Sequence, residues 1–324
     1  MKNFYYLHNG RSALNFILKN VHLKNDQEIL YPDFSCDVLF QYDSQNNYKY
    51  NFYQIKRDFK ISLNLIKKKI TKKTKIIIVI NFFGIRQNLK RLYKLCKKKD
   101  ILLVVDDCHT FYNLKKSNNK DCDVKFFSPS KIFDEINIGG ILQVNNNSLK
   151  ITNELRKSLF DYDLILNLKN KLKKISIYKK LKFSRKRPKY EDQNFFESSI
   201  NVNNFSLTKK NIKKINSINI FNENKKRKYN FKFWVSICDK LKIKPLLKIK
   251  DIEHGCPLFF VAHCRNENLR KNIFDLGWKN KINIISWPTL HSDQKKNKKV
   301  INYWKKLIYF PMNEKFYKKK KITK

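Results

Sequence analysis

The chain has 324 residues, of which 42% are hydrophobic, and a formal net charge of +44 from 71 Lys and Arg against 27 Asp and Glu. This length allows one large and one smaller domain with a sizeable core, and no apolar run approaches the roughly 20 residues of a membrane span. Nearly all the cations are Lys, spread along the chain, whereas Arg is the better residue for phosphate and base recognition. We therefore expect no membrane insertion and no nucleic-acid partner, although the charge should attract anionic ligands such as nucleotide phosphates.

Strand and helix signals alternate in the first part of the chain, and the strand signals are short and rich in β-branched residues. In chain order they predict a helix over 12–18, strands over 28–31 and 48–55, a helix over 61–70, a strand over 76–82, a helix over 89–96, and strands over 101–106, 124–127 and 140–144. Strands separated by helices of this length are typical of a mainly parallel sheet with helices on both faces.

The pattern changes after about residue 150. A Lys-rich helix is predicted over 155–183, a linker or surface loop over 184–192, two helices within 207–241, a strand over 257–263, a helix over 267–276 and a strand over 282–286. This order indicates a smaller α+β unit. We expect a large domain over residues 1–200 and a small C-terminal domain over 201–324.

The seven cysteines indicate the compartment. Their number is odd and no Cys-x-x-Cys pair occurs, so a disulfide framework is not expected and a cytoplasmic location fits. The first six residues lack the apolar core of a signal peptide. His254, Cys256, His263 and Cys264 have irregular spacing, which favours packing over a zinc site, and we expect no metal.

Asp106 ends the predicted strand 101–106. Ligands of parallel sheets bind at the carboxyl ends of the strands, where Asp106 would lie. A carboxylate there could bind a metal, a ribose or a protonated ring nitrogen, or simply cap the next segment. His109 lies three residues further on. If the chain turns helically after Asp106, both side chains share one face, and His109 could orient Asp106 or lie against a ring.

Lys131 follows Ser128 at the end of the next predicted strand. The two side chains would lie on one side of a turn. The hydroxyl could hold a phosphate, and the amine could bond to an aldehyde. Phe126-Phe127 and Gly139-Gly140 flank the lysine, and an apolar setting would lower its pKa by desolvation, as a nucleophilic amine needs.

A glycine turn, Gly10-Arg11-Ser12, leads into the first predicted helix. Free N–H groups and the positive end of the helix dipole make such a helix start a phosphate site, although the turn could be only an N-cap. Together with a carboxylate for a pyridine nitrogen and an amine for an aldehyde, this layout is what a pyridoxal phosphate (PLP) enzyme needs.

The chain resembles the DegT/DnrJ/EryC1/StrS family of PLP-dependent sugar aminotransferases. The resemblance rests on the order and spacing of separate motifs, namely His8 to Leu14, Tyr31 to Val38, Asn81 to Gly84, the Asp106 and Lys131 segments, Ser286 to Pro288 and Tyr309 to Met312. It implies the aspartate-aminotransferase fold (fold type I), with a mainly parallel central sheet, helices on both faces and a smaller α+β C-terminal domain.

The resemblance also implies a role for individual residues. Lys131 would bond to the cofactor aldehyde and later move a proton, Asp106 would keep the pyridine nitrogen protonated, and His109 would lie by the ring. Gly10, Arg11 and Ser12, with the Ser128 hydroxyl, would hold the phosphate. Cys36 stands where many relatives have a stacking aromatic, so that neighbouring Phe34 could contribute instead. The segment 199–205 is the nearest counterpart of the stretch that in relatives serves the partner subunit's site.

The implied activity is transfer of an amino group, with glutamate as donor, to a nucleotide-linked keto sugar in glycan or polysaccharide biosynthesis. A homodimer is implied, since fold-type-I sites lie at a dimer interface. Two alternatives stay open: different PLP chemistry on the same fold, and a non-catalytic basic protein that binds a cofactor or nucleic acid.

Overall fold

The computed structural model describes residues 2–40, 48–112, 121–133, 135–136, 138–145, 190, 207–252 and 255–313. The expected helix over 155–183, nearly all of the loop 184–192, the segment 199–205 and the expected domain boundary at residue 200 lie outside these residues.

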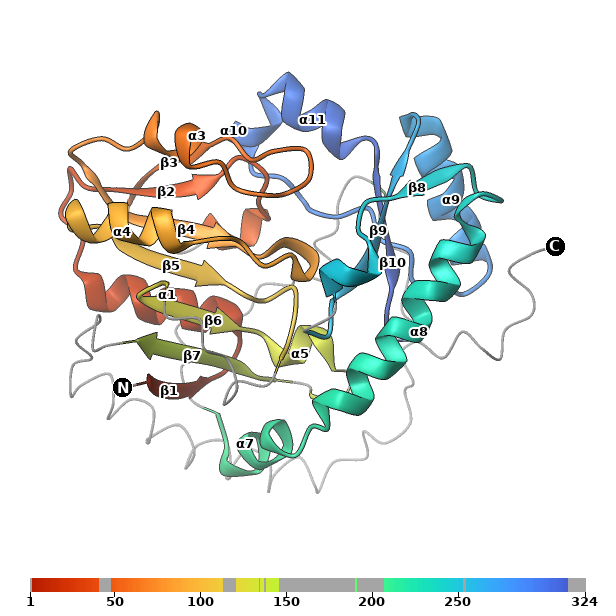
Figure 1. Ribbon diagram of the computed structural model, residues 1–324, viewed down its shortest axis with the longest axis horizontal. Coiled ribbons are helices and arrows are strands. Elements are labelled where there is room, and N and C mark those ends of the chain that lie inside the picture. The colour runs from red at the N-terminus through yellow and green to blue at the C-terminus, as the bar shows by residue number, and fades with distance from the viewer. Residues whose placement is uncertain are drawn as a thin grey trace, which may run out of the picture.

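A seven-stranded sheet forms the first part of the molecule (Figure 1). Its strands are β1 Lys2–Leu7, β2 Glu28–Pro32, β3 Lys49–Tyr53, β4 Thr74–Ile80, β5 Leu102–Asp106, β6 Val124–Phe127 and β7 Gly140–Asn145, in the spatial order β1-β7-β6-β5-β4-β2-β3. The pairs from β6 through β5, β4 and β2 to β3 are parallel. Strand β7 is antiparallel to both β6 and β1. The mainly parallel sheet predicted from the sequence is therefore confirmed.

Helices cover both faces of this sheet. The elements that follow its strands are α1 Gly10–Val21, η1 Asp37–Phe40, α3 Leu63–Lys67, η2 Phe82–Gly84, α4 Lys90–Lys98 and α5 Pro129–Ile132. Ile76 and Ile78 of β4 share one buried cluster with residues of α1, whereas Ile77 and Val79 share another with α3 and α4. Successive residues of a strand point to opposite faces, so the continuous apolar run of β4 serves both layers.

The second part of the chain builds a smaller three-stranded antiparallel sheet in the order β10-β9-β8. Its elements are α7 Lys209–Asn216, α8 Ile220–Cys238, β8 Ile243–Pro245, η3 Ile249–Ile252, β9 Phe259–Cys264, α9 Glu267–Lys279, α10 Ser292–Lys295, α11 Lys298–Trp304 and β10 Leu307–Pro311. In Figure 1 the long helix α8 runs from α7 beside the large sheet to the small sheet. This unit confirms the predicted α+β character.

The strand predicted over residues 282–286 is wrong. Within this range only Ile285 pairs, in an isolated bridge to Tyr309. Ile282 and Ile284 are buried against neighbouring elements, and burial without a strand partner gives the same apolar pattern as a strand. Strands β1, β8 and β10 were not predicted.

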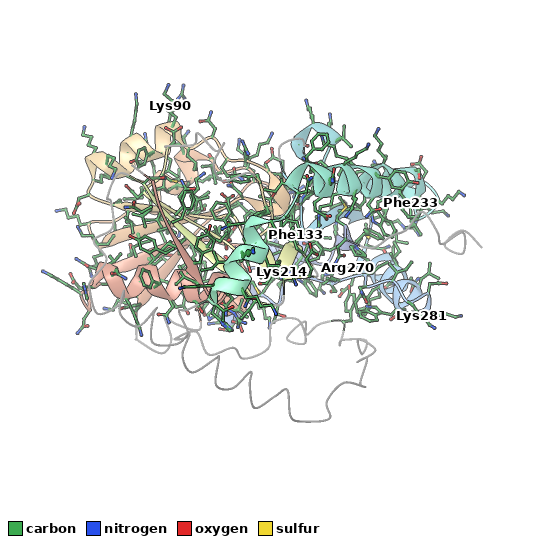
Figure 2. The ribbon with its side chains drawn as sticks, turned by 90° about the horizontal axis from the view of Figure 1, so that it is seen from below. Lys90, Phe133, Lys214, Phe233, Arg270 and Lys281 are labelled. Carbon is green, nitrogen blue, oxygen red and sulfur yellow. The ribbon has the colours of Figure 1, made fainter. Side chains whose placement is uncertain are left out.

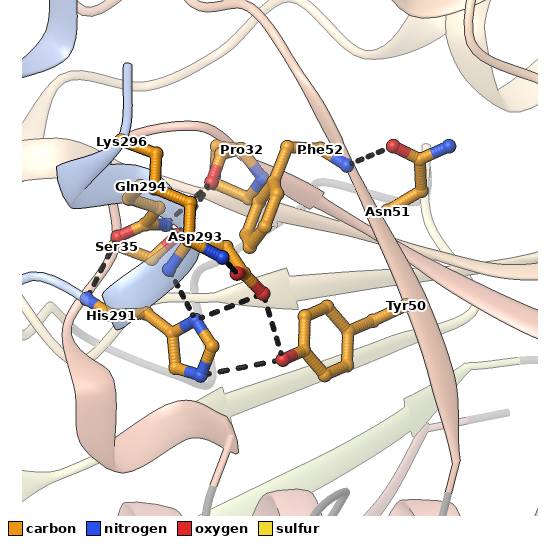
Figure 3. A network of polar contacts seen from close by, with 9 residues as sticks. All are labelled: Pro32, Ser35, Tyr50, Asn51, Phe52, His291, Asp293, Gln294 and Lys296. Carbon is orange, nitrogen blue, oxygen red and sulfur yellow. Dashed lines mark hydrogen bonds and ion pairs between the residues drawn. The ribbon is translucent and has the colours of Figure 1, made fainter. Parts of the chain in front are cut away.

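The C-terminal segment also packs on the large sheet. Asp37 donates its backbone N–H to the Thr289 carbonyl, and the Gln294 amide donates to the Ser35 hydroxyl at 3.1 Å. Figure 3 shows the neighbouring contact, in which the Tyr50 hydroxyl lies 3.3 Å from both the His291 ring and the Asp293 carboxylate. The loop after β2 is thus held by residues about 250 positions later in the chain.

Lysines of the described residues occur on several parts of the surface, as Lys90, Lys214 and Lys281 show (Figure 2). Among the helices of the described residues, none is both long and apolar enough to cross a membrane.

Gly140 provides a test of how closely α1 is seated on the sheet. A Cβ atom at Gly140 would lie 2.2 Å from the backbone oxygen of Asn9, whereas one at Gly139 would first meet the flexible end of Ile215, at 2.9 Å. We expect Gly140→Ala to lower the free energy of unfolding by about 3 kcal/mol, because a backbone must move. Gly139→Ala is the matched control and should cost clearly less in chemical denaturation. Equal losses in the two variants would contradict this packing.

Candidate active site

Three segments that are distant in the sequence meet at the carboxyl end of the parallel strands. Gly10 begins α1, Cys108 follows β5, and Ser128 follows β6. A Cβ atom at Gly10 would lie 2.7 Å from the Cys108 sulfur and 3.3 Å from the Ser128 Cβ. The glycine turn, the Asp106 segment and the Lys131 segment are therefore in direct contact, as a common site requires.

Asp106 is a buried carboxylate at the end of β5. Its Oδ1 accepts the backbone N–H of Cys108 at 2.8 Å. Burial raises the pKa of Asp106, and the Cys108 hydrogen bond and the nearby charge of Lys131 oppose that rise. A carboxylate with this much desolvation is suited to a cationic partner that enters the site, such as a protonated ring nitrogen.

Asp107 is also buried, but its oxygens have structural partners. Its side chain accepts hydrogen bonds from the Asn81 amide and, at 2.6 Å, from the Tyr112 hydroxyl. The buried Lys125 ammonium lies 4.0 Å away. These contacts support the choice of Asp106 over Asp107 as the group that faces a ligand.

His109 is a buried, neutral imidazole. Burial lowers its pKa to about 3, and the Lys131 charge acts in the same direction. Its Nδ1 accepts the Phe83 N–H at 3.4 Å, so the proton of the neutral ring lies on Nε2. The imidazole is stacked on Phe83, with ring centroids 5.5 Å apart, and meets Trp287 edge-on at 4.9 Å. One face of His109 is therefore covered by protein.

Lys131 lies in the single-turn helix α5, near enough to Asp106 and His109 to influence the pKa of both. Ser128 is the N-cap residue of this turn and is buried. The apolar enclosure expected for Lys131 is not found, since the residue is exposed. Phe126 and Phe127 point into the core instead, on opposite faces of β6.

Arg227 of α8 fixes the end of α5 from the other half of the chain. Its buried guanidinium donates to the Ile132 carbonyl and, at 2.7 Å, to the Pro257 carbonyl. Ile132 is the residue after Lys131, so Arg227 restrains the backbone that carries the amine. The sequence reading missed Arg227, and the only signal was a rare Arg in a Lys-rich helix.

The start of α1 differs in detail from the expected phosphate site. The Ser12 backbone N–H donates to the Asn9 side chain at 2.9 Å, so Asn9 already caps it. The Ser12 hydroxyl, in contrast, is buried without a hydrogen-bond partner in the structure. A buried hydroxyl without a partner is uncommon, and a phosphate oxygen would satisfy it. Gly10, Arg11 and the Ser128 hydroxyl remain the other proposed phosphate ligands.

Phe34 and Cys36 lie in the loop after β2. Phe34 is 1% exposed and its ring meets Phe59, Phe82, Trp287 and Tyr303 at angles near perpendicular. Phe34 thus belongs to an aromatic cluster, and Trp287 of this cluster contacts His109. Cys36 is buried and its backbone pairs with Leu290.

Residues 2–158 match the model of the DegT/DnrJ/EryC1/StrS aminotransferase family. This part of the chain belongs to that family. The match contains all the converging segments described above, from the glycine turn to Lys131. No curated protein matches the chain.

Solved structures with the same fold cover nearly the whole chain. Spr1654 from Streptococcus pneumoniae, assigned as a sugar aminotransferase and solved in its PLP form, has a TM-score of 0.64 at 14% identity, over 96% of this chain and 82% of that one. PseC from Helicobacter pylori, an aminotransferase of pseudoaminic acid biosynthesis, has a TM-score of 0.60 at 17% identity, over 95% and 81%. An aminotransferase from Psychrobacter cryohalolentis has a TM-score of 0.64 at 13% identity, over 95% and 82%.

These findings confirm three predictions from the sequence: the family, the fold type and the assignment as a PLP-dependent aminotransferase. The residues present also fit the cofactor, because a buried carboxylate with an amine near it and a buried hydroxyl without a partner lie on adjoining segments. The roles of the individual site residues remain predictions.

His109 yields a test of the site's electrostatics. Folding lowers the pKa of His109 from 6.5 to about 3. Between these two pH values the imidazole is protonated in the unfolded chain but neutral in the folded protein, so the free energy of unfolding decreases as the pH falls from 6.5 to about 3. In His109→Gln this loss should disappear. We expect the slope of the free energy of unfolding against pH to flatten by up to about 1.4 kcal/mol per pH unit. Identical slopes in denaturation series of the two proteins would refute a buried neutral His109.

Arg227 provides a second test. Arg227→Lys should weaken cofactor retention about tenfold, because an ammonium cannot hold both carbonyls and the turn that carries Lys131 loosens. Equilibrium dialysis against PLP measures the change. Arg270→Lys is the matched control, since Arg270 is equally buried but donates to the Leu307 carbonyl, away from α5. It should reduce stability and leave retention unchanged; loss of retention in both variants would count against a positioning role.

Proposed function

We propose that the protein is a PLP-dependent aminotransferase that moves an amino group, with glutamate as donor, to a nucleotide-linked keto sugar. The observation that supports the proposal is the close approach of Gly10 to Cys108 and Ser128, which brings the start of α1 next to the segments that carry Asp106 and Lys131. Other PLP enzymes of this fold would need the same arrangement, so the choice of a sugar acceptor rests on the family and its relatives.

When bound, PLP supplies an electron sink for chemistry at the amino-bearing carbon and stores the amino group between two substrates. Asp106 would hold a proton on the ring nitrogen, and the burial that raises the pKa of Asp106 would strengthen this pairing. Lys131 Nζ would bond to the cofactor aldehyde and, once released, carry a proton to or from the reacting carbon. Its exposure leaves the amine accessible to a substrate.

The remaining residues would bind and orient the cofactor. The Ser12 and Ser128 hydroxyls and the Gly10–Arg11 backbone would contact its phosphate at the N-terminus of α1, where the helix dipole favours an anion. His109 would lie beside the ring, and Phe34 and Cys36 from the loop after β2 would complete this part of the site. The aromatic wall of Phe83 and Trp287 would exclude water from this side.

Support for a sugar acceptor comes from PseC and Spr1654, which are described as sugar-pathway aminotransferases. We place the reaction in the cytoplasm, in glycan or polysaccharide biosynthesis, and expect a homodimer whose partner subunit completes the site. A second candidate is other chemistry with the same cofactor. A protein named for a different product, 3-amino-5-hydroxybenzoic acid synthase, has a similar fold, with a TM-score of 0.64 at 11% identity.

The amino-group transfer is tested with the purified protein. Reconstitution with PLP should give a visible or near-ultraviolet absorbance band, and added glutamate should convert it to the pyridoxamine spectrum. Lys131→Ala should lose the band of the lysine-bound cofactor, because no amine remains at this position. Lys90→Ala, an exposed lysine on α4, is the control and should behave as wild type.

A wild-type protein that takes up no PLP would contradict both candidate functions. A protein that binds PLP through Lys131 but is not converted by glutamate or any other amino donor would favour the second candidate over transamination.

A further inference from the structure

A second concave site lies at the carboxyl ends of β2 and β3, facing the C-terminal unit. Its volume is about 420 Å³, within the range of small-molecule pockets. It is built from four regions of the chain: the loop after β2, the loop after β3, His263 of β9, and α11 with its flanking residues. The lining includes Phe34, Lys56, Arg57, His263, Lys299 and Lys306.

Cationic side chains converge on this pocket. Lys56, Arg57, Lys299 and Lys306 line it, and none of the ion pairs found among the described residues involves any of the four. The pKa of His263 is lowered by burial and further by the charges of Lys306, Arg57 and Lys244. The positive field here is therefore local, and it exceeds the charge of the nearby carboxylates, Asp33 in the lining and Asp58 next to Arg57.

One carboxylate also lies in the pocket lining. Asp33 accepts the Ile55 N–H at 3.0 Å, and burial raises its pKa to about 6. With this pKa Asp33 is mostly ionised at neutral pH and offsets part of the positive charge, but the four cations of the lining outnumber it.

The pocket is pre-shaped by a link between its walls. The Tyr303 hydroxyl of α11 donates to the Arg57 carbonyl, which joins the C-terminal unit to the loop after β3. Tyr303 and Phe34 form an aromatic side, with ring centroids 6.2 Å apart. A site with four cations and an aromatic wall suits a ligand that is both multiply anionic and partly planar.

Two aromatic rings, Phe34 and Trp287, separate the pocket from His109 of the proposed catalytic site. Phe34 lines the pocket and meets Trp287 at 6.4 Å, and Trp287 meets His109 at 4.9 Å. A substrate that spans both places would have its anionic part in the pocket and its reacting carbon beyond Phe34.

We propose that this pocket binds the diphosphate group of the nucleotide-linked substrate, with Arg57 and Lys306 as its principal ligands. The inference rests on the proposed function for the identity of the substrate, but the binding itself requires only an anionic nucleotide. Arg57 and Lys306 are chosen because both line the pocket, one from the loop after β3 and the other from the residues after α11.

The test is titration of the full-length, PLP-loaded protein with UDP, dTDP, GDP and CDP in turn, and with the corresponding monophosphates, by isothermal calorimetry. At least one diphosphate should bind, and more tightly than its monophosphate. Arg57→Gln and Lys306→Gln should each weaken that binding about tenfold, the effect of losing one charge-assisted contact. Because both side chains are exposed, the variants should fold, which thermal unfolding verifies.

Two controls have the same change of net charge. Arg91→Gln and Lys90→Gln, both exposed on α4, should alter the dissociation constant by less than about twofold, since charges this distant are screened. Equal weakening in test and control variants would overturn the proposal in favour of a general charge effect. Absence of binding by every diphosphate would also overturn it.

Failure here is separable from failure of the proposed function. A protein that binds no nucleoside diphosphate but is still converted by glutamate would refute the pocket assignment alone. A protein that binds a diphosphate through Arg57 and Lys306 but is not converted by glutamate would retain the pocket and lose the aminotransferase assignment.

Discussion

The site depends on the close approach of Gly10 to Cys108 and Ser128. Any larger residue would displace the Cys108 side chain, because a Cβ atom would lie 2.7 Å from the Cys108 sulfur. This contact seats the positive end of α1 against the carboxyl ends of β5 and β6, where a buried carboxylate and an amine already stand. The parallel sheet supplies the common edge, and the glycine permits the approach.

Burial and hydrogen bonding give two adjacent carboxylates different tasks. Asp107 is fully partnered by Asn81, Tyr112 and Lys125 and holds the end of β5 in place. Asp106 accepts the Cys108 N–H and lies near the charge of Lys131, and burial raises its pKa. The neighbouring side chains, rather than position in the sequence, therefore decide which carboxylate is available to a ligand.

Much of the large sheet could be predicted, because the β-branched runs of β4 and β5 and the helices between strands have regular periodicity. The convergence of the glycine turn with Asp106 and Lys131 followed from strand ends at one sheet edge. The exposure of Lys131 and the capping of Ser12 by Asn9 could not be predicted, since they depend on side-chain direction in single turns. Arg227 and the cationic pocket were missed for another reason: each joins segments far apart in the chain, and a single sequence contains no distance information.

The central claim is that one lysine in this Lys-rich chain is the cofactor's covalent partner. Borohydride reduction of the PLP-loaded protein fixes the cofactor to the amine that holds it, and peptide mass spectrometry then locates the adduct. The account predicts a single stoichiometric adduct on Lys131. An adduct on another lysine, or a distribution over many surface lysines with none favoured, would contradict it.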